Sequence, residues 1–357
     1  MCRWIWIFRR TQPHKPVPCT YIISIKQKGA VQRFALLRES LRRMATALET
    51  YLNFEALDRA AQALSVRSLA QEPMALHTTF KIGGPADRLL FPETEEQLAG
   101  LLQAVKESGL PWLALGNGSN LLVSDLGIRG AVLCLSGSFK KVELLPDGRT
   151  LRAGAGASLA TACAFARDRA LSGLEFAWGI PGSVGGAAYM NAGAYGGEMK
   201  DVLKKAFHIS ASGEPGSAAG EALGLGYRKS RYTGGTDIVT SVELALAPGD
   251  AAQIAARMEE LMARRKEKQP YDQPSAGSVF KRPENGFAAA LIDQCGLKGR
   301  RVGGARVSEK HAGFIVNAGG ATCRDVLELI EIIRETVKQR TGTLLECEVR
   351  VLGEGMG

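Results

Sequence analysis

The residues best suited to binding chemistry lie in two glycine-rich parts of the chain. The segment 116–120 (GNGSN) follows an apolar run, 112–115, that is typical of a strand. Glycines let successive backbone N–H groups approach an anion, and the serine and asparagine add hydrogen-bonding groups, so we expect a diphosphate-binding loop. It is neither a P-loop nor a Rossmann fingerprint, because Gly-Lys-Ser/Thr and Gly-x-Gly-x-x-Gly are both absent from it. A plain tight turn is the alternative interpretation.

The second part comprises 179–186 (GIPGSVGG) and 191–196 (NAGAYG). Closely spaced glycines in an otherwise well-patterned chain indicate backbone packed against something flat or anionic. A chain crossing inside a sheet is the alternative. We favour a second contact surface for phosphate and a ring, because the first loop supplies only one side of a pocket.

Three further places carry reactive groups. Arg228, in the sequence YRKS, is always charged and can hold a carboxylate, although a solvated basic turn has the same composition. Ser278 stands between a glycine and an apolar run, as a turn residue also would. On a strand, Glu346, Glu348 and Arg350 would share one face, and inward-facing acids are costly unless they serve a site. Serine-hydrolase chemistry is not indicated, since no Gly-x-Ser-x-Gly elbow surrounds this serine.

In their order along the chain, these motifs resemble those of the UDP-N-acetylenolpyruvoylglucosamine reductase (MurB) family. The resemblance extends over about residues 73–353. Each motif is modest, but eight in the right order leave little room for coincidence. The matching segments are 79–84 (TFKIGG), 115–122 (LGNGSNLL), 180–186 (IPGSVGG), 191–196 (NAGAYG), 227–230 (YRKS), 276–281 (AGSVFK), 291–299 (LIDQCGLKG) and 345–350 (LECEVR).

The resemblance implies an α+β fold. A two-subdomain FAD-binding region of the vanillyl-alcohol-oxidase (PCMH) type would precede a C-terminal α/β substrate-binding domain. We expect the first FAD-binding subdomain over 46–135, joined by the final strand 346–357, and the second over 136–248. The substrate-binding domain would occupy 249–345, and residues 1–45 have no counterpart.

The resemblance also implies the reaction. Non-covalently bound FAD, reduced by NADPH, would reduce UDP-N-acetylglucosamine enolpyruvate to UDP-N-acetylmuramate, a step of peptidoglycan and cell-wall precursor synthesis. Arg228 would hold the substrate carboxylate as charge develops there. Glu348 would sit nearby in a protonated or proton-sharing form, and Ser278 would donate the proton. Another FAD-dependent oxidoreductase on the same scaffold, or a non-catalytic flavin- or sugar-nucleotide-binding protein, is the alternative.

The same resemblance implies which residues bind the ligands. Arg265 and Lys268 lie three residues apart on one predicted helix face and would meet the substrate, a diphosphate being the ligand that Lys268 suits. Tyr227 and Lys281 are further candidates for substrate binding. The chain resembles the shorter subclass that lacks an extra tyrosine loop, and Arg282 stands where the longer subclass has an asparagine contact. The expected cofactor-binding residues are Gly116, Asn117, Gly118, Ser119, Asn120, Leu121, Ile180, Pro181, Gly182, Ser183, Val184, Gly185, Gly186, Asn191, Gly193 and Ala194.

Charge and cysteine content limit the possible partners. Residues 1–43 hold ten Lys and Arg against one Glu, which accounts for the whole net charge of +9. The rest is neutral, so no nucleic-acid footprint is expected across the fold. We expect residues 1–43 to be a disordered tail or sequence upstream of a start at Met44, with an RNA- or lipid-binding arm as the alternative.

The seven cysteines show no disulfide or metal-binding spacing, and no apolar stretch suits a signal peptide or a membrane span. We therefore expect a cytoplasmic protein, acting as a monomer on small molecules, without metal, membrane or nucleic-acid partners. Hydrophobic patterning and end signals also predict the main elements. Helices are expected over 45–71, between the cap Thr94 and Gly109, from Ser158 to near Gly173, after Asp250 and over 324–340; strands over 112–115, 131–135, 238–246 and 344–352, with a hairpin 141–145/150–153 and mostly loop over 174–197.

Overall fold

The computed structural model describes residues 53–284 and 286–355. The chain divides into a unit 1–54 and a unit 55–357, and the sheets and the site described below belong to the second unit. The basic tail, the candidate start at Met44 and the first part of the predicted helix 45–71 lie outside the described residues. No helix in the described part is both long enough and apolar enough to cross a membrane.

The predicted helix 45–71 is only partly confirmed. Residues 53–63 are helical, but the end of the predicted span forms strand β1 (Arg67–Pro73). There the prediction is wrong, because β1 pairs antiparallel with β2 (Pro85–Phe91). The hydrogen bonds between the two strands satisfy the backbone N–H and C=O groups, which a helix would have paired with one another. Tertiary pairing overrides the weak local preference for helix.

The first sheet has the strand order β1-β2-β5-β3, with β5 parallel to both β2 and β3. Helix α2 (Glu95–Ser108) covers it. The Thr94 side chain accepts a hydrogen bond from the backbone N–H of Gln97, and Gly109 ends the helix in the left-handed conformation, at φ +63°. Both predicted end signals are therefore confirmed. The remaining strands of this part are β3 (Trp112–Leu115), β4 (Leu121–Val123) and β5 (Ile128–Cys134).

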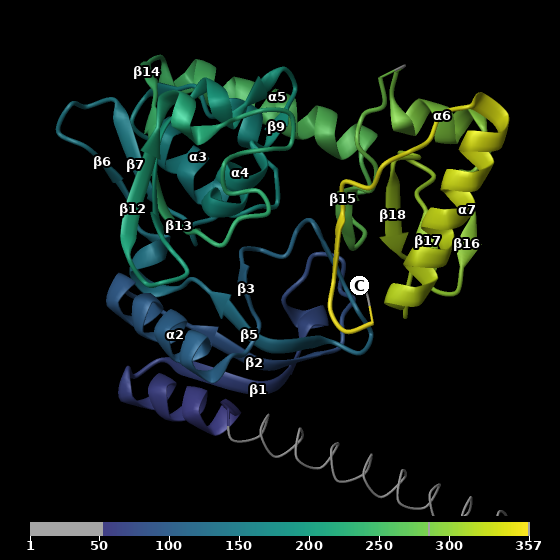
Figure 1. Ribbon diagram of the computed structural model, residues 1–357. Coiled ribbons are helices and arrows are strands. Elements are labelled where there is room, and N and C mark those ends of the chain that lie inside the picture. Colours follow the sequence, from purple (N-terminus) through teal and green to yellow (C-terminus); the bar gives the residue numbers. More distant parts are fainter. Residues whose placement is uncertain (1–52, 285, 356–357) are drawn as a thin grey trace, which may run out of the picture. The chain divides into compact units, whose positions relative to one another are not determined.

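The second sheet is antiparallel, in the order β12-β11-β13-β7-β6, and Figure 1 shows α3 and α4 beside it. The predicted hairpin is confirmed as β6 and β7, and Ser158 caps α3 as expected. The elements of this part are β6 (Val142–Leu144), β7 (Thr150–Gly154), α3 (Leu159–Arg167), β8 (Leu171–Ser172), α4 (Val184–Met190), β9 (Gly193–Ala194), β10 (Gly197–Glu198), β11 (Leu203–Ile209), β12 (Pro215–Ala219), β13 (Ile238–Ala245) and β14 (Ala247–Pro248).

The segment 174–197 is less loop-like than predicted, because it contains helix α4 and the small hairpin β9-β10. The Ser183 side chain accepts a hydrogen bond from the backbone N–H of Gly186 and begins the helix. Asn191, in the left-handed conformation, ends it. Two of its seven residues are glycines, whose low helix propensity argues against a helix when the sequence alone is considered.

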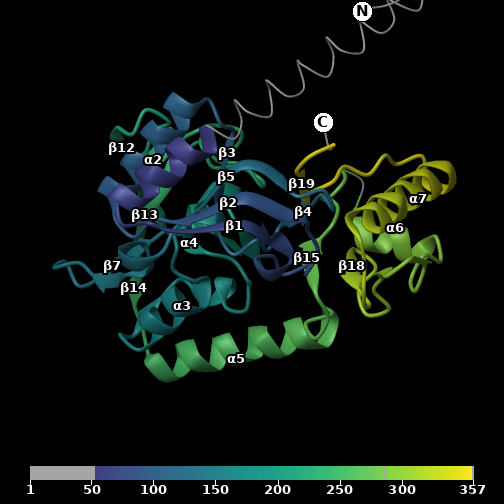
Figure 2. The same ribbon diagram turned by 90° about the horizontal axis from the view of Figure 1, so that it is seen from below.

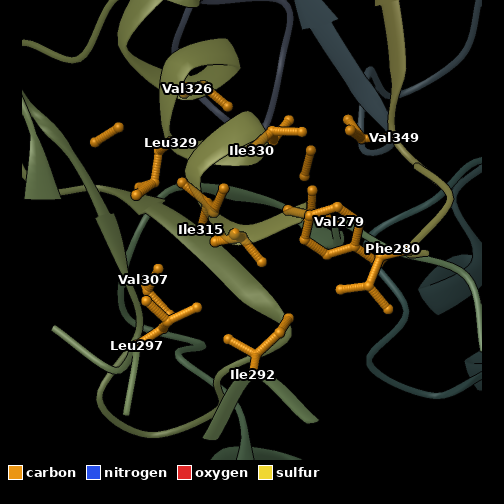
Figure 3. Close-up of a cluster of buried hydrophobic side chains, with 14 of the residues drawn as sticks. Val279, Phe280, Ile292, Leu297, Val307, Ile315, Val326, Leu329, Ile330 and Val349 are labelled. Carbon is orange, nitrogen blue, oxygen red and sulfur yellow. The ribbon is translucent and has the colours of Figure 1, made fainter. Parts of the chain in front are cut away.

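The third sheet has the order β15-β18-β17-β16. Figure 3 shows Ile315 of this sheet and Val279, the residue after β15, in one apolar cluster with Ile330 of helix α7 (Cys323–Thr341). Thr322 caps α7, as predicted, and the carboxylate of Asp125 accepts hydrogen bonds from two backbone N–H groups of its first turn. The other elements are β15 (Ser275–Ser278), α6 (Ala288–Gln294), β16 (Arg301–Val302), β17 (Ala305–Val307) and β18 (Phe314–Asn317).

Helix α5 (Ala251–Lys268) connects the second and third sheets, and Figure 2 shows it running alongside α3. Its N-terminal cap is Asp250. The helix packs against α3 and against the short helical turn Glu175–Ala177, so its C-terminal residues lie near the glycine-rich segment that begins at Gly179. The basic end of α5 thereby reaches the site.

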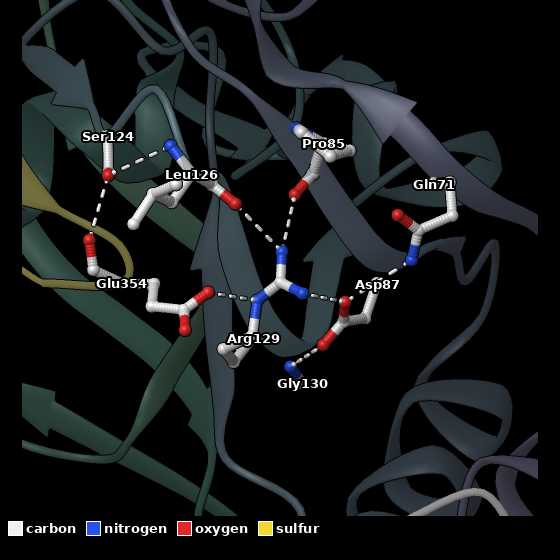
Figure 4. A network of polar contacts seen from close by, with 8 residues as sticks. All are labelled: Gln71, Pro85, Asp87, Ser124, Leu126, Arg129, Gly130 and Glu354. Atoms are coloured by element: carbon white, nitrogen blue, oxygen red, sulfur yellow. Dashed lines mark hydrogen bonds and ion pairs between the residues drawn. The ribbon is translucent and has the colours of Figure 1, made fainter.

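The chain returns to the first part of the fold at its C-terminal end. The predicted strand 344–352 is shorter than expected: β19 (Arg350–Leu352) pairs parallel with β4. Figure 4 shows how the tail is held. Arg129 forms ion pairs with Asp87 and Glu354 at 2.8 and 3.3 Å. The residues just before β19 are therefore fixed between the β4 region and the third sheet.

Candidate active site

The site is a cavity of about 1650 Å³ lined by loops from all three parts of the fold. Its lining includes the segments 116–121, 179–183 and 193–195 together with Ser278 and Glu348. Typical small-molecule pockets enclose roughly 300–1,000 Å³. The cavity therefore has room for a dinucleotide together with a second ligand.

The loop 116–121 has the properties of an anion cradle. Within the described residues, the backbone N–H groups of Asn117, Gly118 and Ser119 donate no hydrogen bond to protein. Gly118 has φ +59°, and a Cβ there would lie 2.2 Å from the carbonyl oxygen of His77. Only glycine fits this close approach, and the free N–H groups border the cavity. These observations fit the diphosphate of a dinucleotide.

The two glycine-rich parts meet across the cavity. A Cβ on Gly116 would lie 2.5 Å from the Ser183 hydroxyl oxygen. The cap at Ser183 therefore places the start of α4 directly against the first loop. Among the predicted cofactor residues, 116–121, 180–183, Gly185, Gly186, Gly193 and Ala194 line the cavity; Val184 and Asn191 do not.

The three predicted catalytic residues lie in the same cavity. Arg228 Nε is 2.6 Å from Glu348 Oε1, although its N–H is not aligned for a hydrogen bond to that oxygen. Ser278 is brought beside Glu348 because the backbone N–H of Glu348 donates to the carbonyl of Val279 at 2.7 Å. The side-chain amide of Asn120 donates to the carbonyl of Glu348 at 3.2 Å and fixes that segment from the other side.

The environment of Glu348 favours its neutral form. Only 12% of the side chain is exposed, and this burial raises the pKa of its carboxyl above the ordinary value, against the opposing effects of Arg228 and Lys281. A carboxyl with a raised pKa can carry a proton beside another carboxylate. The arrangement is thus suited to receive an anionic ligand group beside Arg228 and Glu348.

Arg265 is the second cationic group of the cavity. It is 6% exposed, and its Nε and Nη2 have no hydrogen-bond partner. Within the described residues no carboxylate pairs with it; its Nη1 contacts Gln269 at 3.4 Å and its Cζ lies 5.1 Å from the centre of the Tyr195 ring. Burial lowers the pKa of its guanidinium. Unpaired buried donors facing a cavity indicate an anion-binding position.

Some predicted residues lie elsewhere. Lys268, Tyr227 and Lys281 are exposed and are not among the lining residues. Glu346 was expected to share an inward face with Glu348. That expectation is wrong, because its side chain is 73% exposed and pairs with Lys281 at 3.1 Å, the residues before β19 not being a regular strand.

Sequence reasoning assigned no role to several other lining residues. Tyr271 contacts the Gly179 carbonyl at 3.5 Å, and the Arg350 guanidinium lies over the ring of Tyr189 at 5.1 Å. Tyr195 was noted only as part of its motif. Their one sequence signal was position beside the glycine-rich segments or beside Glu348. Within the described residues, the cysteines are free thiols and no cluster of three or more His, Cys, Asp or Glu could hold a metal ion.

Comparison with known proteins agrees with this geometry. Residues 269–352 match the UDP-N-acetylenolpyruvoylglucosamine reductase C-terminal domain, and residues 86–218 match an FAD binding domain. The UDP-N-acetylenolpyruvoylglucosamine reductase of Geobacillus kaustophilus is 49% identical over 80% of this chain and 93% of its own length. That of Alkaliphilus oremlandii is 50% identical over the same shares. The chain belongs to the UDP-N-acetylenolpyruvoylglucosamine reductase family.

A solved structure supports the family assignment. The crystal structure of the family member from Thermus caldophilus is 39% identical, with a TM-score of 0.69 over 80% of this chain and 98% of its own. The family resemblance inferred from the motifs is thus confirmed. The expected α+β fold with an FAD-binding region and a C-terminal domain is confirmed with it, as is FAD as the cofactor.

Proposed function

We propose that this chain catalyses the NADPH-dependent reduction of UDP-N-acetylglucosamine enolpyruvate to UDP-N-acetylmuramate, in the synthesis of peptidoglycan precursors. The observation that carries the proposal is the convergence of Arg228, Glu348 and Ser278 on the cavity that the glycine-rich loops also line. Relatives 49% identical to the chain bear the name of this reductase. The cavity's size allows FAD and a sugar nucleotide to be present together.

FAD would be held non-covalently by the lining residues of 116–121, 180–183 and 185–186, with Gly193 and Ala194 beside them. When bound, it supplies the hydride that NADPH provides. The free backbone N–H groups of 117–119 suit its diphosphate. Val184, which is fully buried, would contribute only by fixing the loop.

The residues of the chain bind and protonate the substrate. Arg228 holds the carboxylate of the enolpyruvyl group and stabilises the charge that develops there as hydride reaches the vinyl methylene carbon. Burial raises the pKa of the Glu348 carboxyl, which favours sharing a proton with the substrate carboxylate over repelling it. Ser278 delivers the proton to the neighbouring carbon, which completes the lactyl ether. Exclusion of water around the buried pair strengthens these interactions.

Arg265 binds the diphosphate of the sugar nucleotide in this proposal. Its two unpaired donors and its burial support that role. Lys268, Tyr227 and Lys281 remain candidate substrate contacts at exposed positions outside the lining. The free thiols support a cytoplasmic location, since cytoplasmic thiols stay reduced, and we propose a monomer that needs only small-molecule partners.

The test is anaerobic. The flavin of the purified protein is reduced with one equivalent of NADPH, and UDP-N-acetylglucosamine enolpyruvate is then added while the visible flavin spectrum is followed. Rapid reoxidation is expected. Bleaching by NADPH without reoxidation would remove the substrate assignment and leave another flavin-dependent oxidoreductase.

A Ser278→Ala variant tests the proton donor in the same experiment. NADPH should still bleach the flavin at the wild-type rate, whereas reoxidation by the enolpyruvyl substrate should slow by about 100-fold or more, within the usual range for loss of a general acid. A variant that stalls at NADPH oxidation instead would contradict the assignment. Retention of flavin with full turnover would favour a different donor.

A further inference from the structure

Asn191, at the C-terminal end of α4, makes the hydrogen bonds of its side-chain amide to groups inside the protein. The residue is 1% exposed and does not line the cavity. Its Nδ2 donates to Glu198 Oε2 at 2.7 Å and to the Gly226 carbonyl at 2.9 Å, and its Oδ1 accepts from the backbone N–H of Lys200 at 2.8 Å. Both N–H donors are thereby occupied, and none remains for a cofactor.

The identity of these partners requires a carboxamide. Two acceptors, a carboxylate and a carbonyl, face the Nδ2 atom, and one donor faces the Oδ1 atom. Aspartate has the same shape, but it would turn a negatively charged oxygen toward the Glu198 carboxylate and the Gly226 carbonyl. Buried acceptors that face one another without a donor between them destabilise the folded protein.

The Gly226 carbonyl closes the turn that carries Arg228. The backbone N–H of Gly226 donates to the Lys229 carbonyl at 2.9 Å, and that of Lys229 donates back at 3.1 Å. Inside this turn Arg228 has φ +52°, in the left-handed region that residues with a Cβ disfavour. Such a conformation persists only where the surroundings hold it.

A second contact holds the other side of the turn. The hydroxyl of Ser230 donates to the carbonyl of Tyr189 at 2.8 Å. Tyr189 and Asn191 are both at the C-terminal end of α4, so the residues on each side of Arg228 are fastened to one end of one helix. The Arg228 guanidinium then reaches Glu348 and the Gly193 carbonyl.

We infer that Asn191 is a positioning residue for Arg228, holding the turn Gly226–Lys229 through its bond to the Gly226 carbonyl so that the guanidinium meets the substrate carboxylate. This inference rests on the proposed function, in which Arg228 binds that carboxylate. It replaces the expectation that the Asn191 side chain binds the cofactor.

The test is Asn191→Asp in the FAD-loaded enzyme. Flavin reduction by NADPH and the dissociation constant of FAD should each stay within about twofold, whereas reoxidation by UDP-N-acetylglucosamine enolpyruvate should slow about 10- to 100-fold, because misplacement of a positioning group by about 1 Å has that effect. Binding of UDP-N-acetylmuramate, which carries the carboxylate, should weaken relative to UDP-N-acetylglucosamine, which lacks it. A merely structural role would weaken both ligands equally.

The matched controls use the neighbouring acceptor. Glu198→Gln retains an oxygen for the Asn191 amide and should turn over like the wild type. The double variant Asn191→Asp/Glu198→Gln removes the repulsion between the two carboxylates but leaves the Gly226 carbonyl without the hydrogen bond from residue 191. It should regain thermal stability without regaining the reoxidation rate. Recovery of both would overturn the inference.

A pH profile adds an independent readout. The groups that face the Glu348 carboxyl with charge are Arg228 and Lys281, and both oppose the rise that burial causes in its pKa. Displacing Arg228 should move the pKa of Glu348 further up, and with it the pH dependence of reoxidation. If the aspartate variant fails to retain FAD, Asn191→Ser, which removes the Gly226 bond without adding charge, gives the same test.

The outcomes separate the two proposals. Wild-type enzyme that is not reoxidised by the enolpyruvyl substrate refutes the proposed function. Wild-type enzyme that is reoxidised, together with an Asn191→Asp variant of equal rate and equal ligand preference, refutes the positioning role alone.

Discussion

Substitution of Arg265 should affect ligand binding and protein stability in opposite directions. We expect Arg265→Met to weaken the binding of the sugar nucleotide and, at the same time, to stabilise the ligand-free protein. The arginine is 6% exposed, with two N–H groups unpaired and no carboxylate beside it within the described residues. Methionine keeps an apolar stem of similar reach and removes the charge.

The magnitudes follow from these contacts. A hydrogen bond to a charged group contributes about 1.5–3 kcal/mol, so loss of the diphosphate contact should raise Kd about 10- to 150-fold. Each buried unsatisfied donor costs about 1–3 kcal/mol, while the lost contact with the Tyr195 ring offsets about 0.5–2 kcal/mol. The net is therefore a stabilisation of up to about 5.5 kcal/mol, and a mid-range gain of about 3 kcal/mol should raise Tm by about 4 °C at roughly 2.1 cal/mol/K of unfolding entropy per residue.

The assay combines two measurements on the oxidised, FAD-loaded enzyme. Titration with UDP-N-acetylglucosamine enolpyruvate, followed by flavin absorbance, gives Kd; thermal unfolding without the nucleotide gives Tm. Arg264→Met is the matched control, because Arg264 lies 5.4 Å from the same Tyr195 ring but is exposed and contacts Glu260 at 3.5 Å. It should change neither quantity appreciably.

Two results would refute this reasoning. An Arg265→Met variant that binds the nucleotide as tightly as the wild type would show that the unpaired donors do not meet the substrate. A variant that is less stable than the wild type would show that the arginine is already compensated in the ligand-free protein.

Two further predictions concern Glu348 and the cofactor loop. Burial raises the pKa of Glu348, so this residue contributes stability to the folded protein that is present below the ordinary pKa of 4.5 and is lost as pH rises through the folded-state pKa. In chemical denaturation at a series of pH values, Glu348→Gln should flatten that part of the pH–stability curve, and an unchanged slope would contradict the assignment. The same variant should slow turnover at least about tenfold. Gly118→Ala would place a Cβ 2.2 Å from the His77 carbonyl oxygen and should weaken FAD binding about 5- to 150-fold, since strain of about 1–3 kcal/mol enters at the loop. Gly148→Ala, at φ +70° with open space around it, is its control and should retain FAD, as measured by fluorescence titration; equal losses in both would mean that the approach to His77 is unimportant.

Helix ends could be predicted from the sequence, because they depend on residues only a few positions apart. Thr94, Ser158 and Thr322 each cap the helix predicted after them, because a side-chain oxygen three residues before a free N–H acts without tertiary help. Strand β1 was misread as helix because its partner strand, not its own composition, satisfies its backbone. Helix α4 was missed because glycine weakens the local signal and the packing around it compensates.

The site was predictable in a different sense. Arg228, Ser278 and Glu348 stand far apart in the chain, and only the order of the motifs, through the family resemblance, indicated that they meet. Motif reasoning also treated most residues of the glycine-rich segments as contacts. Asn191 shows why that fails: an asparagine that ends a helix in the left-handed conformation can direct its amide into the protein while Gly193, two residues further on, lines the cavity.

Helix α4 gives a physical reason for the closeness of the two glycine-rich motifs. Its first turn is capped by Ser183, which lies against the cofactor loop at Gly116, and its last residues hold the turn of Arg228 through Asn191. Seven residues at about 1.5 Å each set roughly 10 Å between the two ends. One residue more would rotate the C-terminal end by about 100° and separate the Asn191 amide from the Gly226 carbonyl. The length of this short helix therefore fixes where the turn of Arg228 lies relative to the loop at Gly116.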